Sequence, residues 1–171
     1  VRMGEAYRKK PLKSRDMLVT DAKGNFHILK NSNAEELKAL MEAEDAIVNV
    51  FNFGPALVID GEEQAMPAKY NYNITGKEPR CAIGQVGELE YLLVVVDGRN
   101  QGGSKGCTVE TLAHFMAEQG CTQAYNLDGG NSALMVFNGE NYSHKSFAAE
   151  RSVSDIIYFA TAVDFGLDSK E

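Results

Sequence analysis

The sequence predicts a single domain, spanning residues 1–171, of the α/β fold class in its mixed α+β form. We expect a mixed sheet with a central β-α-β unit and at least two helices packed on it. The length of 171 residues is that of one domain, and 44% hydrophobic with 24% charged residues is ordinary globular usage. Short β-branched runs alternate with stretches in which apolar residues recur at helical spacing, and this alternation predicts the mixed class.

The N-terminal half is expected to form four strands and one helix. A turn-rich stretch at 21–25 separates two apolar segments and predicts a hairpin. Asn33 followed by Glu36 fits a capping box at the start of a helix with one apolar face. The expected strands are 17–20, 26–29, 47–51 and 56–59.

The second half contains the stronger signals. Residues 62–79 are polar and show little periodicity, so we expect a surface loop there and hypothesise that it acts as a lid. The continuous apolar run 92–96 predicts a strand buried on both faces. Thr108 is the expected N-cap of a helix that Gly120 closes. Further strands are expected at 123–127, 133–137 and 156–160.

The strand, glycine-rich loop, helix and strand from 92 to 127 form a β-α-β unit if the two strands are parallel. Their carboxyl ends then share one edge, where open α/β sheets bind ligands, and that edge carries Asp97 and Asp128. The loop before the helix suits an anion, because a helix N-terminus presents unpaired N–H groups. Its order of residues is that of neither a Walker loop nor Gly-x-Gly-x-x-Gly, which disfavours a nucleotide and leaves open a site for a single phosphate group. The glycines and donors of this loop are Gly102, Gly103, Ser104, Lys105, Gly106 and Thr108.

Composition and missing motifs exclude several classes. The net charge of −7 argues against a nucleic-acid partner, and the longest apolar run is far shorter than the roughly 20 residues of a membrane span. No Gly-x-Ser-x-Gly and no His-Glu-x-x-His motif occurs, and no catalytic pattern surrounds the three histidines, His27, His114 and His144. The three cysteines, Cys81, Cys107 and Cys121, fit neither a disulfide framework nor CxxC zinc spacing.

Several blocks follow one another in a specific order. Asp97-Gly98-Arg99 precedes Ser104-Lys105-Gly106-Cys107-Thr108, which opens a helix, and then come Asn126-Leu127-Asp128-Gly129-Gly130-Asn131-Ser132 and Glu150-Arg151. These blocks resemble those of the phosphodiester glycosidase family, which includes the lysosomal uncovering enzyme and bacterial exopolysaccharide-associated relatives. Blocks at 52–57 and 79–84 also match, so the resemblance spans roughly residues 17 to 160.

The resemblance implies hydrolysis of the bond between the anomeric carbon of a sugar and a phosphodiester, with no cofactor. A phosphate is already a good leaving group, so such a site needs charge stabilisation more than acid catalysis. The implied candidates for acid, base or nucleophile are Asp97, Asp128 and Glu150. The implied substrate and phosphate contacts are Arg80, Arg99, Ser104, Gly106, Thr108, Asn126, Gly129, Gly130, Asn131, Ser132 and Arg151.

Two departures from the family pattern bear on these expectations. Gly130-Asn131-Ser132-Ala133 replaces the usual Gly-Gly-Ser-Ser, which removes one hydroxyl position. The opening block of the family is expected ahead of Val1, so the chain is interpreted as the larger, C-terminal part of a family domain. The expected partners are a small-molecule or polysaccharide phosphodiester substrate and the N-terminal segment of the same precursor. The family implies an extracytoplasmic location, either secreted or in the cell envelope.

Two alternatives stay open at this point. A non-catalytic module of the cell envelope would bind phosphosaccharides without turnover. A structural domain would instead hold Ca²⁺ through Asp97 and Asp128, because carboxylates are preferred ligands of calcium.

Overall fold

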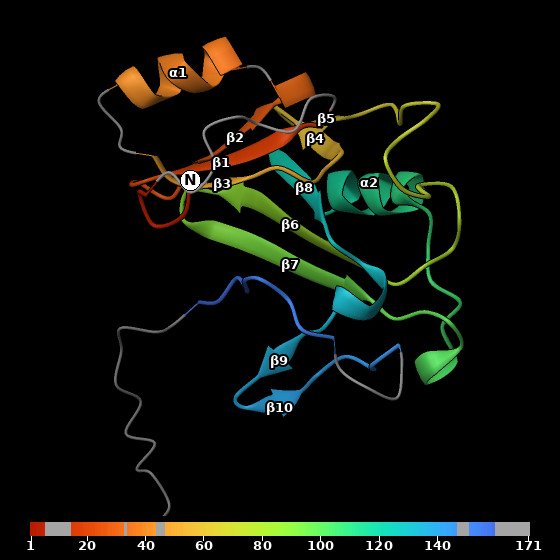
Figure 1. Cartoon of the computed structure of the whole chain (residues 1–171). Coiled ribbons are helices and arrows are strands. Elements are labelled where there is room, and N and C mark those ends of the chain that lie inside the picture. The colour runs from red at the N-terminus through yellow and green to blue at the C-terminus, as the bar shows by residue number, and fades with distance from the viewer. Residues whose placement is uncertain (6–14, 33, 44–46, 147–150, 160–171) are drawn as a thin grey trace, which may run out of the picture.

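The computed structural model describes residues 1–5, 15–32, 34–43, 47–146 and 151–159. A three-stranded sheet has the order β2-β1-β3, a five-stranded sheet has the order β5-β4-β8-β6-β7, and β9 with β10 forms a separate hairpin (Figure 1). No helix in these described ranges is long and apolar enough to cross a membrane. The expected α+β class is confirmed, and the strands divide between two main sheets.

The three-stranded sheet is built on the predicted N-terminal hairpin. Its strands are β1 (Met17–Asp21), β2 (Phe26–Leu29) and β3 (Ile47–Phe51), and β1 pairs antiparallel with both neighbours. Helix α1 (Ala34–Glu42) lies over this sheet, where Leu37 and Leu40 pack against residues of β1 and β2 (Figure 1). The predicted N-cap Asn33 lies outside the described residues.

The five-stranded sheet carries the predicted β-α-β unit. Every neighbouring pair of its strands is antiparallel. Because β7 and β8 both pair antiparallel with β6, they run parallel to each other with β6 between them. Helix α2 connects them, so the unit forms around an inserted central strand. The elements are β4 (Ala56–Ile59), β5 (Glu62–Glu63), β6 (Arg80–Gly87), β7 (Glu90–Val96), α2 (Val109–Glu118) and β8 (Gln123–Leu127).

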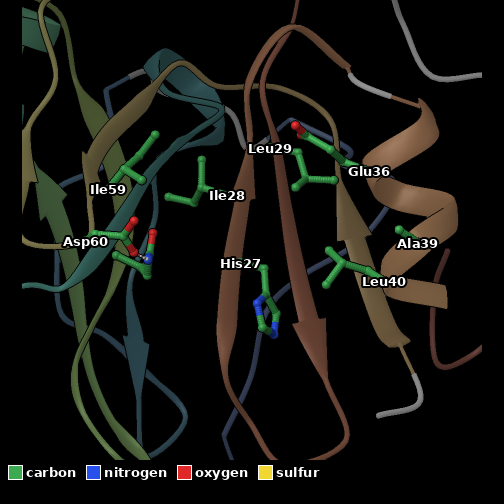
Figure 2. A pocket seen from close by; sticks show the side chains of 9 residues that line it. His27, Ile28, Leu29, Glu36, Ala39, Leu40, Ile59 and Asp60 are labelled. Carbon is green, nitrogen blue, oxygen red and sulfur yellow. Dashed lines mark hydrogen bonds between the residues drawn. The ribbon is translucent and has the colours of Figure 1, made fainter. Parts of the chain in front are cut away.

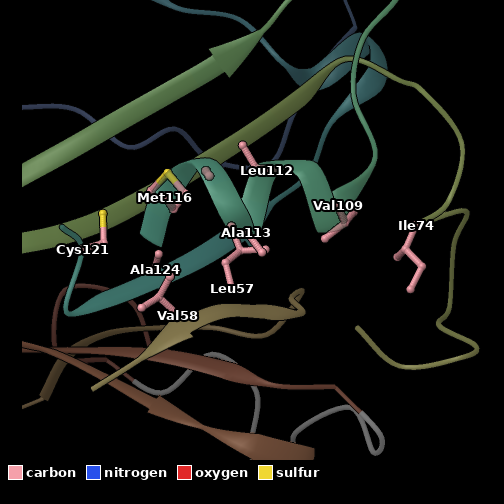
Figure 3. Close-up of a cluster of buried hydrophobic side chains, with 10 residues drawn as sticks. Leu57, Val58, Ile74, Val109, Leu112, Ala113, Met116, Cys121 and Ala124 are labelled. Atoms are coloured by element: carbon pink, nitrogen blue, oxygen red, sulfur yellow. The ribbon is translucent and has the colours of Figure 1, made fainter. Parts of the chain in front are cut away.

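Two hydrophobic clusters hold the five-stranded sheet in place. On one face, α2 buries the side chains of Val109, Leu112, Ala113 and Met116, which recur at helical spacing and pack with residues of β4 and β8 (Figure 3). Burying a side chain such as Leu112 contributes about 1.5–3 kcal/mol. On the other face, Leu18 and Phe26 of the first sheet join Ile83 and Tyr125 of the second. The layers therefore run from α1 through two sheets to α2.

Strand β6 lies inside the sheet, between β8 and β7, although no strand was expected at 80–87. Its sequence, RCAIGQVG, interrupts its apolar residues with Gly84 and Gln85. A Cβ atom on Gly84 would lie 2.6 Å from Cys121 Sγ and 2.8 Å from Met116 Cε. A glycine is therefore needed at the point where the end of α2 approaches the sheet, and it weakens the strand signal in the sequence.

Replacing Gly84 by alanine should lower the free energy of unfolding by about 1–3 kcal/mol, because the added methyl group overpacks the contact with α2. Urea denaturation at neutral pH measures the change. Gly87→Ala in the same strand is the matched control, since its Cβ would meet the side chain of the exposed residue Glu90, with Oε2 the nearest atom at 3.0 Å. Equal losses in the two variants would contradict this account.

Three strand predictions differ from the structure. The run 92–96 is wrong as a strand buried on both faces, because β7 is the edge strand and Leu93 is 42% exposed. The strand expected at 133–137 is reduced to β9 (Val136–Phe137), which pairs with β10 (Glu140–Asn141) after the 3-10 turn Gly130–Ser132. Residues 156–159 form no strand and Ile156 is 75% exposed, while residue 160 lies outside the described part. Apolar runs alone do not reveal how many neighbours a strand has.

Candidate functional site

Asp97 and Asp128 directly follow the carboxyl ends of β7 and β8. Val96 pairs with Arg80 and Leu127 pairs with Cys81, so the aspartates lie on either side of the start of β6. Since neighbouring strands are about 4.8 Å apart, the backbones of β7 and β8 are separated by roughly 10 Å here. The predicted placement of both carboxylates at one sheet edge is confirmed.

Three motif glycines bring their loops against the backbone of residues 78–80. A Cβ atom would lie 2.8 Å from Pro79 N if placed on Gly98, 2.5 Å from Glu78 O if placed on Gly106, and 2.5 Å from Pro79 O if placed on Gly129. Real Cβ atoms do not approach backbone so closely, so each position requires glycine. These glycines therefore close the protein's own loops around the first residues of β6, and the substrate contacts expected of Gly106 and Gly129 stay predictions.

Asp97 is held in place by His144. The backbone N–H of His144 donates to Oδ1 at 2.9 Å, and the ring Nδ1 lies 2.7 Å from Oδ2. The aspartate side chain is 22% exposed and the histidine side chain 62% exposed. No motif marks His144 in the sequence, because it lies in a loop and meets its partner across 47 residues.

Arg99 reaches from the end of β7 to the loop after β8. Its Nε donates to Glu78 Oε2 at 2.8 Å, and a terminal guanidinium nitrogen donates to Asn131 Oδ1 at 2.7 Å. Arg99 and Asn100 have φ values of +56° and +65°, a left-handed conformation that non-glycine residues adopt rarely and often at functional sites. The structure thus brings together the predicted residues Arg99 and Asn131 and adds Glu78.

Asp128 lies beside Arg151, with 3.8 Å between the carboxylate and guanidinium groups. The two side chains are 49% and 59% exposed, so the carboxylate is open to a ligand. In the next turn, the Oγ atom of Ser132 is buried and makes no hydrogen bond to a described residue. Glu150, the third carboxylate implied by the family resemblance, lies outside the described residues.

Arg80 is buried beneath this edge and only 4% exposed. Its Nε donates to Cys107 O at 3.1 Å, and a terminal nitrogen donates to Asn73 O at 3.0 Å and Gly76 O at 2.8 Å. Burial lowers the pKa of Arg80, but a guanidinium remains charged in proteins. These contacts tie the loop 64–79 to the start of α2, and the role of Arg80 as a phosphate contact stays a prediction.

Aromatic residues secure the same loop. Tyr70 Oη donates to Phe53 O at 2.7 Å and Tyr72 Oη donates to Gly54 O at 2.6 Å, while Ile74 is buried in the core. Burial raises the pKa of Tyr70 to about 12, so its hydroxyl remains a donor at neutral pH. The described loop is therefore anchored at several points, which leaves the lid hypothesis without structural support.

Asn126 lies below the site, only 1% exposed. Its Nδ2 donates to Gly54 O at 2.9 Å and to Tyr72 Oη at 2.6 Å, whereas its Oδ1 makes no hydrogen bond to a described residue. This geometry links β8 to the turn before β4. Contact of Asn126 with sugar or phosphate, as the family resemblance implies, stays a prediction.

The polar groups of the loop before α2 also have internal partners. Ser104 Oγ donates to Asp97 O at 2.5 Å and accepts from Gly106 N at 3.1 Å. Thr108 Oγ1 accepts from Thr111 N at 3.0 Å, which confirms Thr108 as the N-cap. Val109 N donates to Ile74 O. An anion that binds here would have to displace these bonds, and the phosphate role of Ser104, Gly106 and Thr108 stays a prediction.

The chemistry of the edge rests on carboxylates, guanidinium groups and one imidazole. Burial raises the pKa of Cys81 to about 11, helped by the negative charge of Asp128, and burial also raises the pKa of Cys107. Neither thiol is therefore a ready nucleophile at neutral pH. In the described ranges no group of three or more His, Cys, Asp or Glu side chains is placed to hold a metal ion. A calcium ion bound by Asp97 and Asp128 would therefore have no third ligand of these four residue types among the described residues.

A groove of about 450 Å³ lies elsewhere, between β2, α1 and the strands β4 and β8 (Figure 2). Its walls are apolar at Ile28, Leu40 and Ile59, and Asp60 and Gln123 lie at one side. Gln123 is the first residue of β8, whereas Asp128 follows its last residue. The groove therefore lies at the opposite ends of the strands from Asp97 and Asp128. None of the motif residues lines it.

Comparison with known proteins agrees with this arrangement. The model of the phosphodiester glycosidase family (NAGPA) matches residues 2–160. The SPbeta prophage-derived uncharacterized protein YomE of Bacillus subtilis (strain 168) is 32% identical over 64% of this chain and 17% of its own length. The N-acetylglucosamine-1-phosphodiester alpha-N-acetylglucosaminidase of Bos taurus is 32% identical over 50% of this chain and 16% of its own length.

A solved structure supports the fold. The zebrafish N-acetylglucosamine-1-phosphodiester alpha-N-acetylglucosaminidase catalytic domain, auto-inhibited by its pro-peptide, superposes with a TM-score of 0.58 at 22% identity. The match covers 78% of this chain and 45% of the zebrafish chain. The chain spans less than a fifth of the length of the two curated relatives. Because the family model covers nearly every residue, including all the motif blocks at the sheet edge, the chain belongs to the phosphodiester glycosidase family.

Proposed function

We propose that the chain is a hydrolase that cleaves the bond between the anomeric carbon of a sugar and a phosphodiester. The observation that carries the proposal is the sheet edge at which Asp128 lies beside Arg151 while Arg99 extends across to Asn131. Family membership supports the reaction class. The name of the bovine relative makes an N-acetylglucosamine-1-phosphodiester the first substrate to test.

In this proposal, Arg99 and Arg151 hold the phosphodiester, because planar guanidinium groups match phosphate oxygens in charge and geometry. Glu78 and Asn131 fix the orientation of the Arg99 guanidinium. Asp128 stabilises the positive charge that develops at the anomeric carbon as the phosphate leaves. Asp97 has both carboxylate oxygens engaged by His144 and supports the site from the side.

We place this reaction outside the cytoplasm, in cell-envelope or exopolysaccharide metabolism, on the basis of the resemblance to extracytoplasmic family members. Recovery of the protein in the cytosolic fraction alone would contradict that location.

Incubation of the purified chain with an alkyl N-acetylglucosamine-1-phosphodiester tests the activity. We expect release of one equivalent each of free sugar and alkyl phosphomonoester, followed by ³¹P NMR and a reducing-sugar assay. An alkyl mannose-1-phosphodiester tests the choice of sugar, and a dialkyl phosphate without sugar serves as the negative control. Saturable binding without product would contradict the proposal and favour the non-catalytic binding module.

A further inference from the structure

The pair formed by Asp97 and His144 has a defined geometry. A carboxylate only accepts hydrogen bonds, so the short contact of 2.7 Å between Asp97 Oδ2 and His144 Nδ1 places the ring proton on Nδ1. In the neutral ring the other nitrogen, Nε2, then carries the lone pair. Nε2 makes no hydrogen bond to any described residue, and the side chain is 62% exposed at the sheet edge.

The chain on both sides of His144 is hydrogen-bonded to the segment that follows β8. Ser143 Oγ accepts from Met135 N at 2.8 Å, and Ser146 Oγ donates to Gly130 O at 3.0 Å. The ring itself packs against Gly102, where a Cβ atom would lie 2.7 Å from Nδ1. The imidazole is therefore held between the loop after β7 and the loop after β8, where the substrate is proposed to bind.

We propose that His144 is the general base that activates the water molecule in the hydrolysis of the sugar-1-phosphodiester, oriented by Asp97. The inference rests on the proposed function and assigns a catalytic residue outside the family motifs identified above. Water oxygen forms the bond to the anomeric carbon, and the water proton moves to His144 Nε2. The bond from the anomeric carbon to the phosphate oxygen breaks, and the phosphomonoester leaves with the electron pair. The imidazolium, stabilised by Asp97, then returns its proton to solvent.

A base suits this reaction better than an acid. The phosphomonoester is a good leaving group and departs without prior protonation, whereas neutral water is a weak nucleophile. Among the described residues, Asp97 contacts the ring and Lys145 is the next residue along the chain. The Asp97 carboxylate fixes the tautomer and orientation of the ring and leaves Nε2 to accept the proton.

Two variants of His144 test the role. His144→Ala removes the base, and His144→Gln keeps a side-chain donor for Asp97 but cannot accept the proton. Both should lower kcat by about 10²–10⁴-fold, with KM changed only a few-fold. Imidazole added at millimolar concentration should restore a measurable part of the rate of His144→Ala, because the vacated site is open to solvent. His114→Ala, which removes an exposed histidine bonded to Glu63, is the control and should retain the full rate.

The outcomes separate the two proposals. No hydrolysis by the wild-type chain overturns the proposed function and the base with it. Wild-type hydrolysis with an undiminished rate in either His144 variant overturns the base alone. A loss of rate that imidazole does not restore at all also overturns it, because a purely structural role would give that result. Finally, ¹⁵N NMR of the neutral ring should show the proton on Nδ1, and a proton on Nε2 would contradict the assignment.

Discussion

Replacing Asp128 by asparagine should lower kcat for sugar-1-phosphodiester hydrolysis by about 10³-fold or more, with the free energy of unfolding nearly unchanged. The substitution keeps the size of the side chain and removes the negative charge that faces the developing oxocarbenium-like centre. Its contact with Arg151 is 3.8 Å long and half exposed, and such pairs contribute between 0 and about 1 kcal/mol to stability. Initial rates at saturating substrate, with thermal melts of both proteins, measure the two effects.

The matched control is Asp60→Asn. Asp60 lies in the groove at the other edge of the sheet, and its φ of +52° is one that asparagine tolerates well. We expect the control to keep the wild-type kcat. A wild-type rate in Asp128→Asn, or a similar loss in both variants, would remove Asp128 from the mechanism.

Replacing Arg80 by alanine should lower the free energy of unfolding by about 3 kcal/mol or more. The substitution removes three hydrogen bonds that a charged donor makes, to the carbonyl oxygens of Asn73, Gly76 and Cys107, and a hydrogen bond to a charged group contributes about 1.5–3 kcal/mol. Urea denaturation followed by circular dichroism measures the loss. The amide exchange rate should increase most in the segment 73–79, which these bonds hold.

Two further variants, each replacing an arginine, show whether the loss of stability is specific to the buried guanidinium. Arg80→Lys keeps the charge but lacks the planar fork of donors, so it should lose an intermediate amount. Arg151→Ala removes an arginine that is 59% exposed and should change stability by less than about 1 kcal/mol. If Arg80→Ala were as stable as Arg151→Ala, the buried guanidinium would have no structural role, and its assignment as a phosphate contact would regain ground.

Local sequence patterns were sufficient to predict the elements that are marked by turn residues, caps or apolar periodicity. The hairpin of β1 and β2 follows from turn residues between apolar runs, and α2 follows from the Thr108 cap and helical spacing of apolar residues. Strand β6 could not be predicted, because Gly84 is required by packing against Met116 and Cys121, and these contacts exist only in the folded chain. The edge position of β7 likewise depends on strand order, which a run of valines does not encode.

The candidate site, too, could be predicted only in part from the sequence. The topology of a β-α-β unit was enough to place Asp97 and Asp128 at one edge. The partners of these groups arise from segments distant in sequence, as with His144 and Asp97, and no spacing rule reports such a pair. Arg80, Asn126, Arg99 and Asp128 all lie in motif blocks, but Arg80 and Asn126 are buried whereas Arg99 and Asp128 are exposed, and the sequence does not reveal this difference.

The packing of Gly98, Gly106 and Gly129 on residues 78–80 makes this end of the five-stranded sheet one cooperative unit. Gly106 packs on Glu78, and Gly98 and Gly129 pack on Pro79, so a shift of this segment would displace all three loops. Local opening at this edge is therefore expected to be all-or-none, with the motif loops gaining and losing their order together. A chimera that exchanges one of these loops between family members would need the matching 78–80 segment to restore a working site.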